Sequence, residues 1–300
     1  MLQKKLAGIC VVRNARDLIG LACAHYLRIG FGHIRIIDDG STDGTYDLLC
    51  RLARKEKRVS VSQVSNTEFH QAELMSEMAN DLIRDGYSMI LPFDADEFWN
   101  VSGPALEARY ARHSEITFLG NWVNFVNNEQ AMNPRPFYLL GIKYRAPVLD
   151  DADETTITQF KRPWVCSTLP KIGFKTTRPV ELRKGQHALT VGPSERDSNL
   201  YEVFHVPLRS RSELFKRALD REPRVAPLRE HPSTGFQSSF HRRAFLDGRV
   251  DDVWRANSAD WNGFLDCYGR PVALEHDNRL RTLILKSYAY VALRYRMLLP

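Results

Sequence analysis

The chain has 300 residues, of which 43% are hydrophobic and 26% charged, a balance that excludes a disordered chain and suits a globular protein with a large core. Its 42 basic and 36 acidic residues give a net charge of +6, which favours phosphates, nucleic acid or an anionic membrane without choosing among them. The basic residues are spread out and form no known nucleic-acid motif, so nucleic acid is not an expected partner. Because no run of about 18 apolar residues could span a bilayer and the cysteines form no CxxC pair, we expect a soluble, reduced, cytoplasmic protein.

The first hundred residues alternate short apolar runs with helix-like stretches, as βαβ units around a parallel sheet do. The expected strands are residues 6–12, 33–37, 59–64 and 89–93, and the expected helices are about 18–29, 43–58 and 71–84. Ligands of such sheets bind beyond the carboxyl ends of the strands. Arg13-Asn14, Asp38-Asp39 and Asp94–Asp96 should therefore meet at one cleft.

Beyond residue 100, prolines interrupt the apolar runs, and we expect mixed strands and long loops. Further helices are expected over 210–221 and 278–299. The fold class is α/β, with a mostly parallel central sheet flanked by helices and a mixed C-terminal half. We assign residues 1–100 to the ligand-binding half, 101–220 to the half that completes the sheet, and 221–300 to a helical extension.

The tetrapeptide Asp94-Ala95-Asp96-Glu97 directly follows the apolar strand Met-Ile-Leu-Pro-Phe. Two carboxylates one residue apart at a strand end can share a divalent cation with a diphosphate. The alternative is a solvated pair in a loop. The same four letters recur at 151–154 without a preceding apolar strand, and we interpret that copy as a solvated acidic loop.

A second acidic motif, DDGSTDGT at residues 38–45, follows the second strand. Its glycines allow a tight turn, and Asp43 can cap the next helix. A turn and a cap account for Gly40, Ser41 and Asp43, but they do not account for both Asp38 and Asp39. We therefore expect a carboxylate here to accept an N–H group of a nucleobase.

Residues 6–100 resemble glycosyltransferase family 2, whose first strand ends near an Asn and whose second strand ends in the motif found at 38–45. The resemblance implies a GT-A fold and inverting transfer from a nucleotide-activated sugar. It also implies that Asp39 holds the nucleobase, that Arg13 and Asn14 border the nucleoside, and that Asn80 precedes the acidic strand. The family often has Glu after the Arg-Asn pair, where this chain has Ala15.

Residues 94–99, DADEFW, resemble a subgroup related to family 92, in which a later segment carries a His, a Ser and a helix with a Lys, as 203–216 do here. That likeness implies that His205 joins Asp94 and Asp96 as a metal ligand, with His187 as the second choice. Taken alone, His205 is better explained as a hydrogen-bonded packing residue, and only the family likeness makes the two interpretations about equal. Mn²⁺ or Mg²⁺ is the expected cofactor, and an imidazole ligand favours Mn²⁺.

A bound diphosphate needs compensating positive charge, and Lys171 is our candidate for it, with Arg178, Arg209 and Lys216 as alternatives. Inverting transfer also needs a base that deprotonates the acceptor hydroxyl. Glu97 adjoins the metal pair and is the predicted base, with Asp153 and Glu154 as rivals. Its neighbours Phe98 and Trp99 favour the alternative that Glu97 is structural. The predicted nucleotide-sugar-binding set is Arg13, Asn14, Asp38, Asp39, Asn80, Asp94 and Lys171.

The sequence thus predicts a metal-dependent glycosyltransferase that moves a sugar from a nucleotide-sugar donor to a glycan or lipid-linked acceptor, in surface polysaccharide assembly. A nucleotidyltransferase is the nearest rival enzyme, but the N-terminus has no Gly-rich phosphate loop ending in a basic residue. A degenerate scaffold protein is the third hypothesis, which the intact acidic motifs oppose. The terminal helix could rest on the inner face of an anionic membrane, or could pack on the domain with a solvated basic face. Its cations are Arg279, Arg281, Lys286, Arg294 and Arg296.

Overall fold

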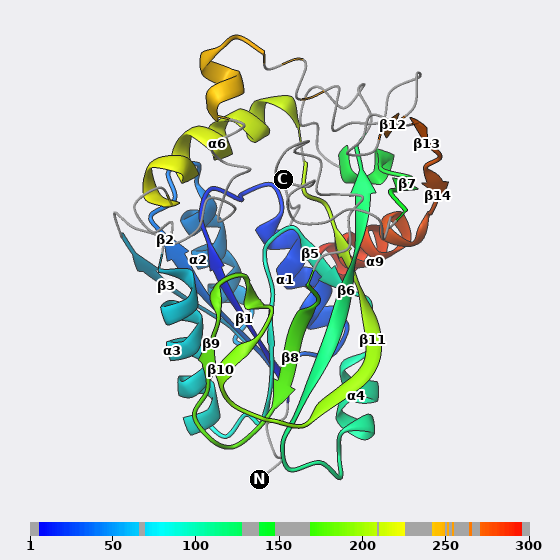
Figure 1. The fold of residues 1–300 in the computed structure, drawn as a ribbon. Helices are drawn as coiled ribbons and strands as arrows, with labels where there is room; N and C mark the ends of the chain where they lie inside the picture. The colour runs from blue at the N-terminus through cyan, green and yellow to red at the C-terminus, as the bar shows by residue number, and fades with distance from the viewer. Residues whose placement is uncertain are drawn as a thin grey trace.

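Four parallel strands form the first half of a central sheet in a computed structural model of the chain (Figure 1). They lie in the order β3-β2-β1-β4. Their bounds are β1 (Leu6–Val12), β2 (His33–Asp39), β3 (Val59–Val64) and β4 (Met89–Pro92). Strand β1 is buried along its whole length, which explains its unbroken apolar sequence. Because the strands are parallel, the loops after β1, β2 and β4 meet at one edge.

Helices cover both faces of this half. Helices α1 (Ile19–Arg28), α2 (Thr45–Lys55) and α9 (Arg279–Tyr295) contribute to the larger core, and α3 (Gln71–Arg84) contributes to the smaller one. Residues of β1 alternate between the two cores, with Cys10 in the larger and Ile9 in the smaller. The sheet is therefore enclosed between helical layers, as a parallel sheet requires.

The second half continues the same sheet with mixed strand directions. Strand β8 joins the halves because it pairs antiparallel with β4 on one side and with β6 on the other. Strand β6 also runs parallel to β11, and β11 pairs antiparallel with β5. The remaining elements are β5 (Glu97–Trp99), α4 (Gly103–Arg109), β6 (Ile116–Val126), η1 (Tyr138–Gly141), β7 (Tyr144–Arg145), β8 (Lys171–Lys175), β9 (Glu181–Leu182), η3 (Lys184–Gln186), β10 (Leu189–Val191), β11 (Arg196–His205), α6 (Arg211–Val225), β12 (Phe264–Leu265), β13 (Pro271–Val272) and β14 (Glu275–His276).

The predicted α/β architecture is confirmed, including the parallel first half and the mixed second half. The helix predicted over 71–84 has those limits, whereas α6 runs through Pro223 to Val225, past its predicted end. The division at residues 100 and 220 stays a prediction. Within the part of the chain that the structure describes, no helix is long and apolar enough to cross a membrane.

The structure describes residues 6–65, 70–127, 138–147, 169–208, 210–225, 242–249, 251, 254, 264–265 and 271–295. The acidic copy at 151–154, which includes the rival bases Asp153 and Glu154, lies outside these ranges. The same holds for Arg209, for Arg296 and for much of the predicted extension over 221–300.

Candidate functional site

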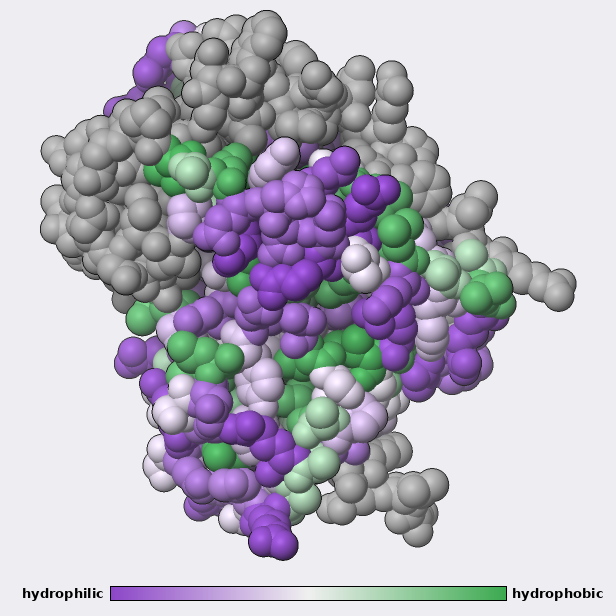
Figure 2. Space-filling model, turned by 90° about the vertical axis from the view of Figure 1, so that its right-hand side faces the viewer, coloured by the Kyte–Doolittle hydropathy of each residue, from purple (hydrophilic) through white to green (hydrophobic). Residues whose placement is uncertain are grey.

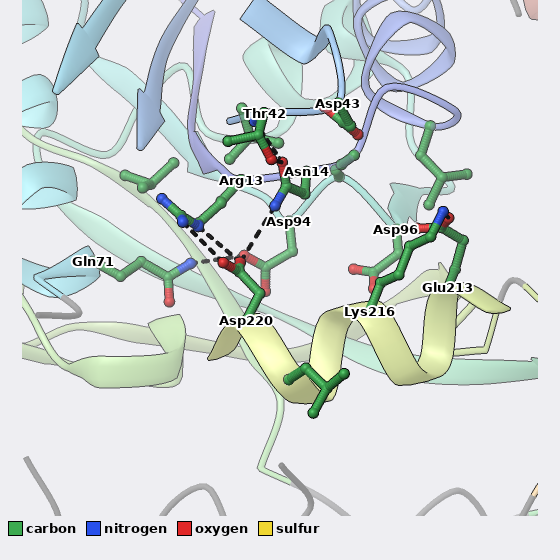
Figure 3. A pocket seen from close by; sticks show the side chains of 16 residues that line it. Arg13, Asn14, Thr42, Asp43, Gln71, Asp94, Asp96, Glu213, Lys216 and Asp220 are labelled. Atoms are coloured by element: carbon green, nitrogen blue, oxygen red, sulfur yellow. Dashed lines mark hydrogen bonds and ion pairs between the residues drawn. The ribbon is translucent and has the colours of Figure 1, made fainter. Parts of the chain in front are cut away.

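A cavity of about 750 Å³ lies where β1, β2 and β4 end (Figure 3). A volume of this size is typical of sites for small molecules. The structure brings four predicted site residues together here, and α6 forms the opposite wall. The lining residues are Val11, Val12, Arg13, Asn14, Ala15, Leu18, Thr42, Asp43, Gln71, Asp94, Ala95, Asp96, Glu213, Lys216, Leu219 and Asp220.

Hydrogen bonds connect the loop after β1 to the loop after β2. Asn14 has a φ of 49°, in the left-handed region that Asn tolerates better than most residues. Its backbone N–H donates to Ser41 Oγ at 2.9 Å, and its side-chain oxygen accepts the N–H of Thr42 at 2.8 Å. Asp43 accepts the N–H of Thr45 at 2.9 Å at the start of α2. These bonds make both loops a fixed wall of the cavity.

Arg13 connects this wall to α6 (Figure 3). Its Nε and Nη2 donate to the two carboxylate oxygens of Asp220 at 2.7 and 2.8 Å, a bidentate pair. Its Nη1 donates to the carbonyls of Asp39 and Gly40 at 2.6 and 2.9 Å. The guanidinium therefore holds α6 against the ends of β1 and β2.

Asp94 borders the cavity and accepts hydrogen bonds from three side-chain donors. Gln71 Nε2 and Gln186 Nε2 donate to Oδ1 at 2.9 and 3.1 Å. Lys171 Nζ donates to Oδ2 at 2.9 Å. Asp94 thus has a fixed orientation and a nearby compensating positive charge.

Lys171 and Glu97 form a buried ion pair next to Asp94. Their side chains are 2% and 1% exposed, with Lys171 Nζ 3.0 Å from Glu97 Oε1, which also accepts the indole N–H of Trp122 at 2.9 Å. Burial raises the pKa of Glu97 to about 7, although Lys171 opposes the shift. Burial lowers the pKa of Lys171, but Asp94 and Glu97 outweigh it and hold that pKa above its usual range. Neither side chain lines the cavity, and Lys171 contacts Asp94 from the protein interior.

Asp96 is 5% exposed and borders the cavity, and its carbonyl accepts the N–H of Val206 at 3.0 Å. That bond puts the end of β11 next to the acidic loop. His205 stacks on Trp122, with ring centroids 4.4 Å apart, and its Nδ1 is 2.7 Å from Asn124 Oδ1. Because an amide oxygen is an acceptor, Nδ1 of His205 donates this hydrogen bond.

Metal ligation by a histidine stays a prediction. His187 directs Nδ1 toward the carbonyl of Pro170, at 3.2 Å. Across the described ranges, no three His, Cys, Asp or Glu side chains are grouped so as to hold a metal ion. In this structure His205 is therefore not assembled with Asp94 and Asp96 into a three-ligand site.

The other predicted residues lie outside the cavity lining, with Asp38 and Asp39 buried and Asn80 half-buried. Asp38 Oδ1 accepts the N–H of Ser41 at 2.9 Å and Gln63 Nε2 at 3.0 Å, which closes the turn after β2. Asp39 is 2% exposed at the end of the same strand. Asn80 exchanges two hydrogen bonds with the backbone of Val180, at 2.9 and 2.8 Å. In this structure Asn80 braces α3 against the chain before β9.

We did not predict from the sequence that α6 forms one wall of the cavity, although Lys216 was named as an alternative cation. Glu213, Lys216 and Asp220 line the cavity at positions i, i+3 and i+7 of one helix. That spacing places them on one face of α6 and was visible in the sequence. Arg13 and Asp220 are 207 residues apart in the sequence, so no local pattern indicated that they would pair.

No protein-family model and no curated protein sequence matches the chain. Among solved structures, residues 1–349 of TarS from S. aureus are similar over 82% of this chain and 73% of that chain, at 14% identity and a TM-score of 0.39. The complex of the same fragment with UDP has a TM-score of 0.40, at the same identity and coverage. The mannosyltransferase PcManGT from Pyrobaculum calidifontis, in complex with GDP-Man and Mn²⁺, is similar over 96% of this chain and 75% of that chain, at 14% identity and a TM-score of 0.35. These scores are low, so the function proposed below rests on this chain's own residues.

Proposed function

We propose that the chain is a glycosyltransferase that binds a nucleotide-sugar donor in the cavity and transfers the sugar, with inversion, to a glycan or lipid-linked acceptor. The observation that carries the proposal is the convergence of Asp94 and Asp96 with Arg13 at one cavity, beyond the carboxyl ends of parallel strands. A nucleoside diphosphate combines a base, a ribose and an anionic group. The cavity suits such a ligand because it combines fixed loops, a guanidinium, and carboxylates that can share a cation with a diphosphate. Surface polysaccharide assembly is the pathway that the family 2 resemblance implies.

We propose Mn²⁺ or Mg²⁺ as the cofactor. Asp96 fits this role because it borders the cavity with carboxylate oxygens, which hard cations prefer. Mg²⁺ commonly takes one or two protein carboxylates and completes its shell with phosphate oxygens and water, so two carboxylates are a sufficient protein contribution. Asp94 already accepts three donors, which makes Asp96 the main ligand. When bound, the ion would neutralise charge on the departing diphosphate.

The chain's own cations would share that task. Arg13 and Lys216 both line the cavity, but Arg13 is paired with Asp220 and must exchange that partner for the diphosphate. Glu97 is buried behind Asp94 and does not reach the cavity lining. We therefore propose that Glu97 positions Asp94 and does not itself take the proton of the acceptor.

The test is calorimetric titration of UDP and GDP with and without Mn²⁺, followed by turnover of a panel of nucleotide sugars. We expect metal-dependent binding of one nucleotide. Asp96→Asn should lower turnover by about 100-fold because it removes a metal ligand. The matched control is Asp47→Asn, since Asp47 is an exposed carboxylate on α2 outside the cavity lining.

Unchanged, metal-independent turnover in Asp96→Asn would overturn the proposed role of the acidic loop. Absence of nucleotide binding under all conditions would favour the scaffold hypothesis. Release of pyrophosphate from a nucleoside triphosphate and a sugar phosphate would identify a nucleotidyltransferase instead.

A further inference from the structure

The outward face of α9 combines cations with exposed leucines. Leu285 and Leu293 are 47% and 85% exposed, although the opposite face of the helix is buried against the larger core. Arg281 and Lys286 are exposed on the same outward side, whereas Arg294 is paired with Glu56. Figure 2 shows the side of the molecule on which α9 lies in Figure 1, where hydrophilic residues gather across the middle with hydrophobic residues beside them. A helix face that is both basic and apolar suits the boundary between lipid headgroups and acyl chains.

A hollow of about 280 Å³ lies beside the first turns of α9, separate from the lining of the larger cavity. Three cations line the hollow, and apolar side chains form the rest of its wall. The lining residues are His25, Arg28, Ile29, Asn100, Val101, Phe204, Arg279, Thr282, Leu283 and Lys286. The hollow thus has the composition expected for an anionic group attached to an apolar body.

Two of the three cations are available to a ligand. Arg279 is already satisfied, since it donates to Asp277 and Glu202 at 2.7 Å each. Arg28 donates through Nη2 to His25 Nδ1 at 3.2 Å, but its Nε is buried and makes no hydrogen bond to any described residue. A buried donor without an acceptor costs roughly 1–3 kcal/mol, which an anionic oxygen in the hollow would recover. Lys286 makes no ion pair with the described part of the chain.

We propose that α9 and this hollow form a docking site for an anionic membrane surface, with a lipid phosphate on Arg28 and Lys286 and with Leu285 in contact with the acyl region. The charges favour an anionic partner, because the described residues that line the hollow include three cations and no acid. The nearby acids Asp277 and Glu202 are both paired with Arg279. This inference goes beyond the proposed transferase and does not depend on it, since membrane binding is measured without donor or acceptor.

The experiment is co-sedimentation of the full chain with phosphatidylcholine vesicles, with and without phosphatidylglycerol. We expect binding only when phosphatidylglycerol is present, and loss of that binding as salt is added. The double variant Arg281→Gln/Lys286→Gln should bind about tenfold more weakly or worse, since each cation near the surface contributes to binding. Leu285→Ser should also bind more weakly. Lys184→Gln, an exposed cation on η3, is the matched control and should bind like the wild type.

Arg28→Gln tests the hollow itself, and its thermal unfolding is measured alongside because Arg28 is partly buried. We expect weaker binding to phosphatidylglycerol vesicles with an unchanged fold. The exposed variants keep the test decisive even if Arg28→Gln unfolds. Equal binding to both kinds of vesicle, binding to neither, or wild-type binding by the double variant would overturn the proposal.

Discussion

His25 is a buried residue whose protonation should make the stability of the fold depend on pH. It is 1% exposed on α1, where Nε2 donates to the carbonyl of Trp99 at 2.9 Å and Nδ1 accepts from Arg28. Burial lowers the pKa of His25 to about 3, so the ring stays neutral in the folded protein. In the unfolded chain the same ring takes up a proton near its ordinary pKa of about 6.5.

This difference predicts an acid-sensitive contribution to stability. Because the folded pKa is depressed, the contribution is fully present above about pH 6.5 and is lost as the pH falls toward 3. Between pH 7 and pH 5 the wild type should lose about 2 kcal/mol more unfolding free energy than His25→Gln, which cannot take up the proton. Urea unfolding at the two pH values measures this. His276→Gln, at an exposed histidine on β14, should keep the wild-type pH dependence, and a His25→Gln variant that keeps it would contradict the prediction.

At the scale of elements, α6 decides how open the candidate site is. Asp220 puts a carboxylate into the cavity and holds Arg13 there, so an anionic ligand meets a like charge and an occupied cation. The pair is partly exposed, with side chains 24% and 29% accessible, and its net contribution to stability should be small. Exchange of Asp220 for the ligand is therefore a feasible step in binding.

Asp220→Asn should consequently tighten the binding of UDP or GDP by about three- to tenfold, since it removes a repelling charge and frees Arg13. Calorimetry of the variant beside the wild type measures the change, and Asp47→Asn should leave the dissociation constant unaltered. If Asp220→Asn binds nucleotide more weakly, then Asp220 contacts the ligand and does not compete with it.

The elements differ in how far the sequence could predict them. Helical periodicity and capping predicted α3 to the residue, and short apolar runs predicted the parallel strands, because both signals are local. The placement of α6 across the cavity depends on the contact between Arg13 and Asp220, which no periodicity encodes. Lys171 was predicted to bind the donor because its charge could compensate a diphosphate, whereas its strand buries it behind Asp94.

On the scale of the whole molecule, β8 holds the two halves of the sheet together. It lies between β4 of the parallel half and β6 of the mixed half, and its first residue, Lys171, supports Asp94. Gly173 lies in the middle of β8, opposite Phe118 of β6. A Cβ at Gly173 would overlap the Phe118 ring, which is 0% exposed and has no room to move. The close approach of these strands therefore requires glycine.

Gly173→Ala should accordingly destabilise the protein by about 1–3 kcal/mol, the usual cost of overpacking a core. It should also weaken nucleotide binding, because a shift of β8 displaces Lys171 and with it Asp94. Urea unfolding and calorimetry measure the two effects on one sample. Gly141→Ala in η1 is the matched control, since a Cβ there has no atom within 4 Å, and its stability should stay within about 0.5 kcal/mol of the wild type. If both alanine variants unfold like the wild type, β8 can adjust to a larger residue, and the acidic loop does not depend on a tight join between the two halves.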